Sequence, residues 1–266
     1  MRSRAKKSAR HKGHEAYLRQ AMMGDFFPED IHLYRLDRHD FVIYVGGDPQ
    51  QTGNTDNSDN GDEPGVEHNM ADRFELNLSI LGNLDPERPI LVKMASCGGN
   101  WEEGMQMFGA ILHAPNPITV LATKWARSMT SLIPLAADRF VIRPPAQYMY
   151  HRGTYAFDGL DEVADTVDIE RRRATERMFR IYVARLKEQG MFSRRSEKAI
   201  REMLDENTRK KIDCWLSADE AKRWGFVDKV YDGKTSTLRI TKKNTERRQR
   251  MIAVLRKNIR VEVFVS

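Results

Sequence analysis

The stretch "PILVKMASCGGNWEEGMQMFGAILHAPNPITVLATKWA", residues 89–126, decides the expected fold. A short apolar segment, 89–96, leads into a Gly-Gly turn, and a second apolar segment, 117–126, closes the stretch. Short apolar runs bounded by turn residues are typical of buried strands. Between them, apolar residues recur at helical spacing, at Trp101, Met105, Phe108 and Leu112. The stretch therefore predicts a strand–helix–strand unit.

The neighbouring segments continue this alternation. "FVIYVG", residues 41–46, predicts another strand, and an apolar face on residues 70–81 predicts a helix after it. Residues 139–151 predict two short strands broken by Pro144-Pro145. An apolar stripe over residues 160–188, with Arg and Glu on the other face, predicts one long helix. Strands that alternate with helices indicate an α/β domain with parallel pairing.

The C-terminal third carries a strong helix-capping signal. "SADEAKRWG" places Ser217 as an N-cap, Glu220 three residues later and Gly225 at the end. A helical segment, 196–208, precedes it, and a short strand, "FVDKVYD", follows it. The last 33 residues mix a basic helix with the alternating stretch "RVEVFVS", whose place in the fold the sequence does not indicate.

Charge is distributed unevenly along the 266-residue chain, which has a net charge of +6. Residues 1–20 carry +6 and residues 234–266 carry +8, which leaves the middle of the chain at about −8. An acidic body with basic ends is not typical of a nucleic-acid-binding domain, so we expect nucleic acid to contact only the ends, and weakly. No apolar run is long enough for a transmembrane helix, and two cysteines are too few for a disulfide scaffold. These features predict a cytoplasmic protein.

Three chemically capable residues stand at strand ends or helix starts. Ser128 stands between an apolar strand and an apparent helix start, His151 ends the strand in "YMYHRG", and Asp213 precedes "CWLSADEA". A serine at a helix start is commonly a cap. It can also be a nucleophile when a histidine takes its proton and a carboxylate orients that histidine. Spacing alone does not show that the three converge.

Four segments, in order, resemble the Clp protease proteolytic subunit family across about residues 41–232. They are "LVKMASCGGNWEEGMQMFGAI", "KWARSMTSLIPLAADRFV", "RPPAQYMYHRG" and "DCWLSADEAKRWGFVDKV". The resemblance implies a Clp/crotonase-type α/β spiral of ββα units, with the 160–188 helix projecting from it. It also implies a peptidase domain over 41–232, with a mobile loop insertion at 46–65. Basic extensions would then cover 1–40 and 233–266.

The resemblance also implies the site. Ser128 would be the nucleophile, His151 the general base and acid, and Asp213 the orienting carboxylate, with Asp205 as the fallback. Gly99 and Met129 would supply the two oxyanion-hole N–H groups. No cofactor and no metal are expected, because the seven histidines lack ligand spacing with Cys or carboxylates.

Departures from the family pattern mark a divergent member, consistent with a phage-encoded relative. Cys97 replaces a proline before the Gly-Gly turn, Arg127 replaces a small residue beside the serine, and Thr130 replaces a glycine after it. Cys97 is a rival nucleophile that we set aside, because it lacks a second aligned base. Pro134 is expected to interrupt the helix that follows Ser128.

Three functions remain open on this basis. The first is a serine endopeptidase acting on protein or peptide substrates inside a homo-oligomer of stacked rings, fed by a separate ATPase unfoldase. The chain itself has no phosphate-binding Gly-x-x-x-x-Gly-Lys-Ser/Thr loop. The second is an inactive assembly subunit, and the third is a crotonase-type acyl-CoA enzyme. A membrane is not expected among the partners.

Overall fold

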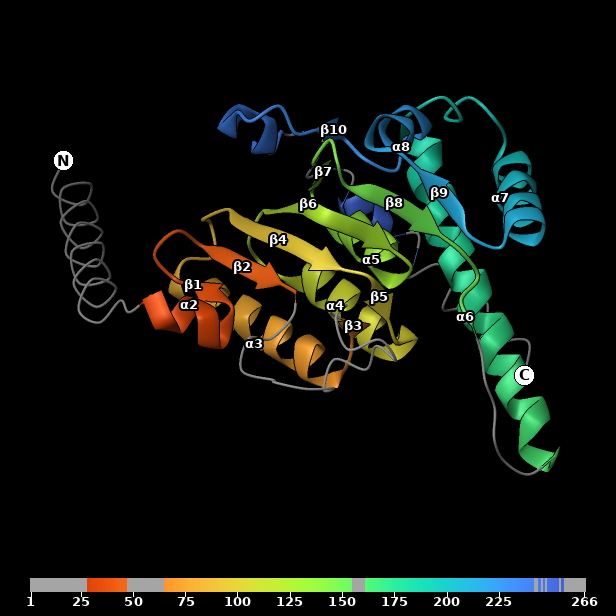
Figure 1. The fold of residues 1–266 in the computed structure, drawn as a ribbon, viewed down its shortest axis with the longest axis horizontal. Coiled ribbons are helices and arrows are strands. Elements are labelled where there is room, and N and C mark those ends of the chain that lie inside the picture. Colours follow the sequence, from red (N-terminus) through yellow and green to blue (C-terminus); the bar gives the residue numbers. More distant parts are fainter. Residues whose placement is uncertain are drawn as a thin grey trace, which may run out of the picture.

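The computed structural model describes residues 28–46, 65–154 and 161–241, together with 244, 246, 248–253 and 255. Within these residues the chain forms a main sheet with helices packed around it (Figure 1). This arrangement confirms the predicted α/β class. The basic residues 1–27, most of the 46–65 loop and the terminal stretch "RVEVFVS" lie outside the described residues.

The main sheet has eight strands in the described part of the chain. They are β1 (Leu36–Asp37), β2 (Val42–Val45), β4 (Ile90–Ser96), β6 (Ile118–Arg127), β7 (Arg139–Ile142), β8 (Gln147–Tyr150), β9 (Cys214–Leu216) and β10 (Lys229–Val230). Two further strands, β3 (Gly65–Val66) and β5 (Gly98–Gly99), pair with each other in parallel. The predicted strands at 41–46, 89–96 and 117–126 are therefore confirmed.

The strand order is β1-β2-β4-β6-β7-β10, with β8 paired to β6 and β9 paired to β8. Pairing is parallel except for β1–β2 and β8–β9, which are antiparallel. One edge of β6 pairs first with β7 and then with β8, because Pro144-Pro145 separates these two strands as predicted. The carboxyl ends of β6 and β8 consequently lie side by side.

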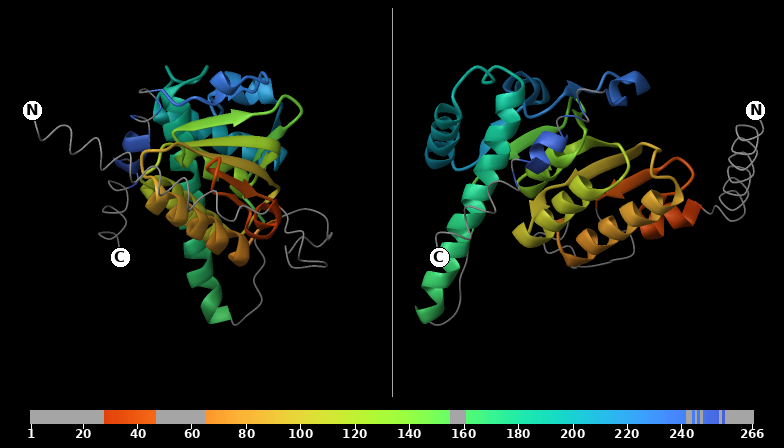
Figure 2. Two further views of the ribbon diagram at one scale, coloured as in Figure 1. Left: turned by 90° about the vertical axis from the view of Figure 1, so that its left-hand side faces the viewer. Right: turned by 180° about the vertical axis from the view of Figure 1, so that it is seen from behind.

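Two amphipathic helices, α3 (His68–Leu84) and α4 (Trp101–His113), lie along one face of the sheet, and α2 (Pro28–Tyr34) lies beside α3 (Figures 1 and 2). The predicted apolar face of α3 is buried, as are Phe108 and Leu112 of α4. Each large apolar side chain that is buried in this way stabilises the fold by about 1.5–3 kcal/mol. The two helices thus hold β4 and β6 in a rigid core.

Directly after Ser128 in the sequence, the chain forms a short helix, α5 (Met129–Leu132), and then a 3-10 turn, η1 (Ile133–Ala136). Pro134 stands in the first turn of η1. A proline has no N–H with which to continue an α-helix, so the predicted interruption is confirmed.

The long helix α6 (Asp161–Glu188) spans 28 residues, or about 42 Å at 1.5 Å per residue. Its second half is buried against the body through Met178, Phe179, Ile181 and Tyr182. Its first half projects beyond the body, as Figures 1 and 2 show. Among the described residues, no helix is both long enough and apolar enough to cross a bilayer.

Two more helices, α7 and α8, follow α6 in the sequence. The first, α7 (Glu197–Lys211), packs against α6. The second, α8 (Ala218–Trp224), carries the predicted capping box: Ser217 and Glu220 each accept the other's backbone N–H, and Gly225 ends the helix in the left-handed conformation. The sequence signal for this helix is confirmed in full.

Residues near the C-terminus also contact the body. A 3-10 turn, η2 (Thr235–Leu238), accepts a hydrogen bond at Leu238 O from the Thr119 hydroxyl. Arg248 is buried, and its guanidinium donates to the Asn116 carbonyl at 2.8 Å and contacts Asp138 at 3.1 Å. The described part of this basic extension is therefore anchored to the body at Thr237, Asn244, Arg248 and Met251, while other residues such as Lys234 and Arg239 are exposed.

Candidate active site

Ser128 occupies a strained turn between β6 and α5. Its backbone angles are φ 51° and ψ −125°, a region that residues with side chains seldom adopt. The turn is fixed by three hydrogen bonds. Ser128 N donates to Met149 O at 3.0 Å, and Ser128 O accepts from the N–H and the hydroxyl of Ser131. The Ser128 hydroxyl does not cap α5, so it is available for another contact.

The sheet register places His151 and Asp213 opposite each other. The last pair of the β8–β9 ladder is Tyr150 with Cys214. His151 directly follows the last residue of β8, and Asp213 directly precedes the first residue of β9. In an antiparallel pair these two positions face each other. A left-handed residue at the end of α7, Ile212 with φ 59°, turns the chain into this position.

His151 contacts both partners through its two ring nitrogens. Nε2 lies 2.8 Å from the Ser128 hydroxyl oxygen, and Nδ1 lies 3.0 Å from Asp213 Oδ1. An ionised carboxylate can only accept, so Nδ1 donates to Asp213 and Nε2 is left to accept from Ser128. The His151 side chain is 17% exposed and that of Asp213 is 43% exposed. The site is thus open to a substrate.

Asp205 does not reach His151. Its carboxylate contacts Arg201 at 3.1 Å and Arg209 at 2.8 Å, and it also binds Arg152. Of the two carboxylates considered from the sequence, only Asp213 contacts the imidazole. Arg152 directly follows His151, so Asp205 instead anchors the segment that leaves β8.

The Gly98-Gly99 turn runs beside Ser128. Asn100 N donates to Val66 O at 2.9 Å, so the N–H of Asn100 points toward β3. Successive N–H groups of an extended strand point to opposite sides, and the N–H of Gly99 therefore faces away from β3. Met129 is the first residue of α5, where a helix leaves N–H groups without intrahelical partners.

Gly98 cannot be replaced by a larger residue without moving Ser128. Its φ is 101°, and an added Cβ would lie 2.5 Å from Ser128 Cβ and 2.9 Å from Met129 N. Gly98→Ala is expected to lower peptidase activity at least about 100-fold and to cost about 1–3 kcal/mol of stability. Peptide hydrolysis and urea unfolding measure the two effects.

Gly109 in α4 provides the matched control, because an added Cβ there meets nothing within 4 Å. Gly109→Ala should leave activity unchanged and stabilise the helix by about 0.5–1 kcal/mol. Equal effects of the two substitutions on activity would contradict this account of the turn.

Two departures from the family pattern have structural explanations. The Arg127 guanidinium donates to Gln147 Oε1 at 2.9 Å and lies 4.7 Å from the ring of Trp215, so it points away from His151 along β8. Thr130 is buried, and its hydroxyl lies 2.7 Å from Ser96 O and 2.8 Å from Arg127 O. Thr130 thereby ties the end of β4 to the end of β6.

Tyr182, a buried residue that the sequence analysis did not single out, supports the Ser128 turn through Ser131. Tyr182 of α6 shares a hydrogen bond of 2.7 Å with the Ser131 hydroxyl, and Tyr148 donates to Ser131 O at 3.0 Å. Burial raises the pKa of both phenols, so they remain protonated. The only sequence signal for Tyr182 was its position beside the apolar stripe of the long helix.

The two cysteines lie next to the site in the sequence, whereas His151 is hydrogen-bonded to Ser128 and Asp213. Cys97 precedes Gly98, and its Sγ lies 3.8 Å from the Gly98 carbonyl oxygen. Cys214 is buried next to Asp213, and burial raises the pKa of its thiol. A raised pKa keeps a thiol protonated and weakens it as a nucleophile.

Comparison with known proteins bears directly on the class of this chain. The Clp protease family model matches residues 63–234. ATP-dependent Clp protease proteolytic subunit 1 of Chlamydia abortus is 28% identical over 170 residues, which cover 63% of this chain and 82% of that protein. The proteolytic subunit of Deinococcus radiodurans is 24% identical, and subunit 2 of Treponema denticola is 23% identical. These two matches cover 63% and 62% of this chain, and 76% and 77% of the relatives.

The fold and the family match define a hydrolase of the peptidase class. The chain belongs to the Clp protease family, as a divergent member, and it is a ClpP-like serine endopeptidase. The resemblance inferred from four sequence segments is thereby confirmed.

Proposed function

We propose that this protein cleaves peptide bonds through Ser128, His151 and Asp213. The observation that supports this proposal most strongly is the unbroken hydrogen-bond chain from the Ser128 hydroxyl through both imidazole nitrogens to the Asp213 carboxylate. A serine hydroxyl is a weak nucleophile until a base removes its proton. The chain of contacts supplies that base and the group that orients it.

In the proposed reaction, Ser128 Oγ attacks the scissile carbonyl carbon while His151 Nε2 takes the hydroxyl proton. The imidazolium then gives this proton to the leaving amine, and an acyl-enzyme on Ser128 remains. Water attacks the acyl-enzyme with His151 again as the base, which releases the acid and restores the serine. Asp213 holds the Nδ1–H tautomer and stabilises the imidazolium in both halves.

We assign the oxyanion hole to the backbone N–H groups of Gly99 and Met129. The Gly99 N–H faces away from β3, and the Met129 N–H begins a helix. Donors of this kind stabilise the negative oxygen of the tetrahedral intermediate, by about 3 kcal/mol for each donor in measured cases. The close approach of Gly98 to Ser128 and to Met129 N supports this assignment, because it sets the Gly-Gly turn beside the first turn of α5.

The proposed working form is a homo-oligomer of stacked rings that encloses the sites and receives protein or peptide substrates. Several relatives are named ATP-dependent Clp protease proteolytic subunits, which supports a separate ATPase as the partner that feeds substrate. A cytoplasmic location is part of the proposal and rests on the two cysteines of the chain, which are too few for a disulfide scaffold. Nucleic acid is expected to bind only weakly, through the basic ends.

A fluorophosphonate probe, which reacts with activated serines, tests the proposed chemistry. The wild-type oligomer should be labelled stoichiometrically, and His151→Ala should lose labelling because Ser128 then has no base. Circular dichroism would verify that this variant is folded. Labelling that survives in His151→Ala would contradict the proposed roles.

The same experiment separates the two alternative functions. A folded oligomer that neither reacts with the probe nor cleaves peptides would be an inactive assembly subunit. Acyl-CoA binding without labelling would favour a crotonase-type enzyme, in which Gly99 and Met129 would serve a thioester oxyanion. The contacts of His151 favour the peptidase, because a crotonase-type reaction would leave them without a role.

A further inference from the structure

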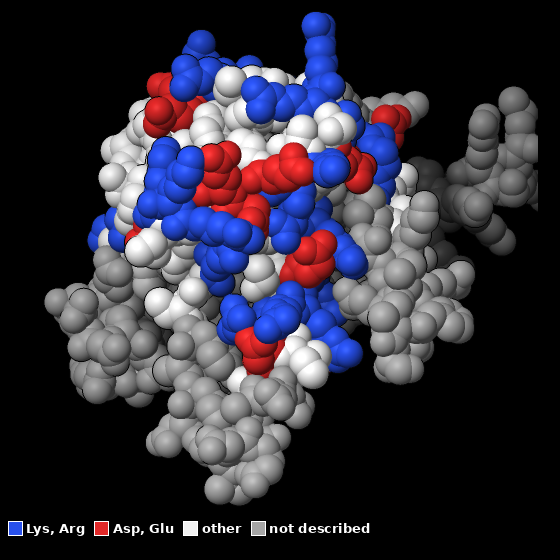
Figure 3. Space-filling model, turned by 90° about the vertical axis from the view of Figure 1, so that its right-hand side faces the viewer, with Lys and Arg blue, Asp and Glu red and all other residues white. Residues whose placement is uncertain are grey.

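A cavity between α6 and α7 is lined mainly by arginines. It has a volume of about 370 Å³ and is open to solvent on the face of the molecule shown in Figure 3. Its walls come from three separate segments, namely the residue after His151, the middle of α6, and α7. Five guanidinium groups line it, from Arg152, Arg171, Arg172, Arg201 and Arg209. We call this cavity the arginine pocket.

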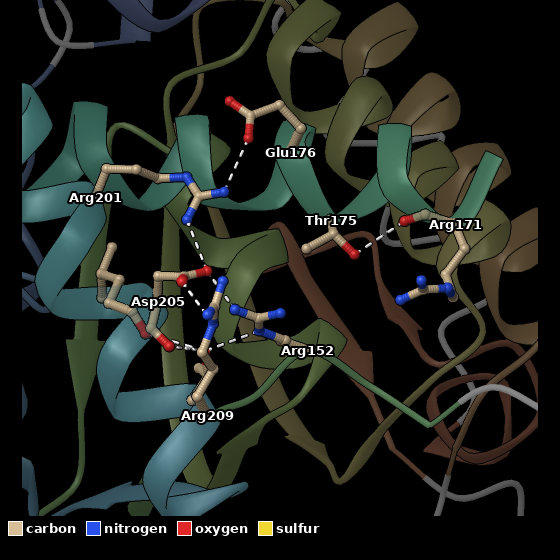
Figure 4. A network of polar contacts seen from close by, with 9 residues as sticks. Arg152, Arg171, Thr175, Glu176, Arg201, Asp205 and Arg209 are labelled. Carbon is tan, nitrogen blue, oxygen red and sulfur yellow. Dashed lines mark hydrogen bonds and ion pairs between the residues drawn. The ribbon is translucent and has the colours of Figure 1, made fainter. Parts of the chain in front are cut away.

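Positive charge exceeds negative charge in the arginine pocket. Two carboxylates of the lining, Glu176 and Asp205, and a third beside it, Asp168, face the five guanidinium groups, which leaves a net charge of +2. Asp205 already serves three of these groups, and Figure 4 shows Arg152, Arg201 and Arg209 converging on it. The carboxylates organise the arginines but do not neutralise them.

The two inner arginines are held in place by other side chains. The Arg201 guanidinium lies 3.9 Å from the ring centroid of Phe179 and bridges Glu176 and Asp205 at 3.0 and 3.1 Å. Arg152 Nε donates to the Thr208 hydroxyl at 3.1 Å. Donors that are fixed before a ligand arrives lose little conformational entropy when it binds.

The outer arginines are exposed and can close over a ligand. Arg172 is 74% exposed and Arg209 is 70% exposed. Each is ion-paired through Nε, Arg172 with Asp168 and Arg209 with Asp205. Two such forks beside two fixed guanidinium groups match the oxygen atoms of a phosphate or sulfate.

We propose that the arginine pocket binds a small, multiply charged oxyanion of the phosphate or sulfate class. An extended polyanion such as a nucleic acid needs a continuous basic stripe. Figure 3 instead shows acidic side chains interleaved with basic ones over this face. The arginine pocket gathers five guanidinium groups around one hollow, an arrangement that fits a small anion better than an extended one. This site is distinct from Ser128, and its existence does not depend on the proposed peptidase mechanism.

Titration of the full-length protein with inorganic phosphate, followed by calorimetry and thermal unfolding, tests this site. Phosphate should bind saturably and raise the melting temperature, whereas sodium chloride at equal ionic strength should not. The double variant Arg172→Gln/Arg209→Gln should weaken phosphate binding at least about tenfold. Peptide hydrolysis should be unchanged in this variant, because neither residue belongs to the proposed catalytic machinery.

Arg173→Gln is the matched control. Arg173 directly follows Arg172 in α6 and pairs with Glu170, but it does not line the arginine pocket. It should bind phosphate as the wild type does. Absence of saturable binding, or equal losses in Arg173→Gln and the double variant, would overturn the proposal. A melting temperature that follows protein concentration and ignores phosphate would also overturn it, by indicating carboxylates of a second copy as the occupant.

Discussion

Ser128→Ala is expected to lower kcat/KM for peptide hydrolysis by about 10⁴- to 10⁶-fold. Removal of the hydroxyl deletes the atom that would form the acyl-enzyme, and His151 then has only water to activate. The backbone of residue 128 is equally strained with either side chain, so stability should change by less than about 1 kcal/mol. Hydrolysis of a fluorogenic peptide and urea unfolding of the same preparation measure both effects.

Cys97→Ala is the natural control for this result. Cys97 lies on the Gly-Gly turn beside the site and is the nearby residue best able to act as another nucleophile. We expect this variant to retain activity within about tenfold. Loss of hydrolysis in Cys97→Ala, with activity preserved in Ser128→Ala, would assign the nucleophile to the thiol and contradict our assignment.

Asp213→Asn is expected to lower kcat by about 10⁴-fold while the protein stays folded. An asparagine amide can donate to Nδ1, which would favour the tautomer with its proton on Nε2. That nitrogen could then no longer accept the proton of Ser128. The Asp213 side chain is 43% exposed, so its neutralisation should change stability little. The measurement is kcat for peptide hydrolysis beside the melting temperature.

Asp205→Asn separates this effect from a general loss of negative charge. Asp205 holds three arginines but does not contact His151, so its substitution should cost about 1–3 kcal/mol of stability with less than about tenfold loss of activity. If Asp205→Asn abolished activity and Asp213→Asn did not, the orienting carboxylate would have been misassigned.

The main elements of the fold could be predicted because their signals are local. The apolar period of α4, the capping box at Ser217 and the Pro144-Pro145 break each determine backbone structure within a few residues. The order of strands in the sheet depends instead on contacts distant in sequence. No local pattern indicated that β8 would pair with both β6 and β9.

In the candidate site, too, local sequence signals could be read in advance, whereas contacts between distant segments could not. The resemblance to a known family named Ser128, His151 and Asp213, and the pairing of β8 with both β6 and β9 brings them together. Residue spacing alone would not have chosen between Asp205 and Asp213, because the choice depends on how α7 turns into β9. The direction of Arg127 was likewise open, since it is set by Gln147 on a neighbouring strand.

Locating the fluorophosphonate adduct on the chain is the most direct test of the central claim, that Ser128 is the nucleophile. The labelled wild-type protein would be digested, and tandem mass spectrometry would locate the added mass. We expect one adduct per chain, on Ser128 Oγ, in the peptide that contains "SMTSLIPLAADR". An adduct on Ser131, on Cys97 or on any residue other than Ser128 would contradict the account.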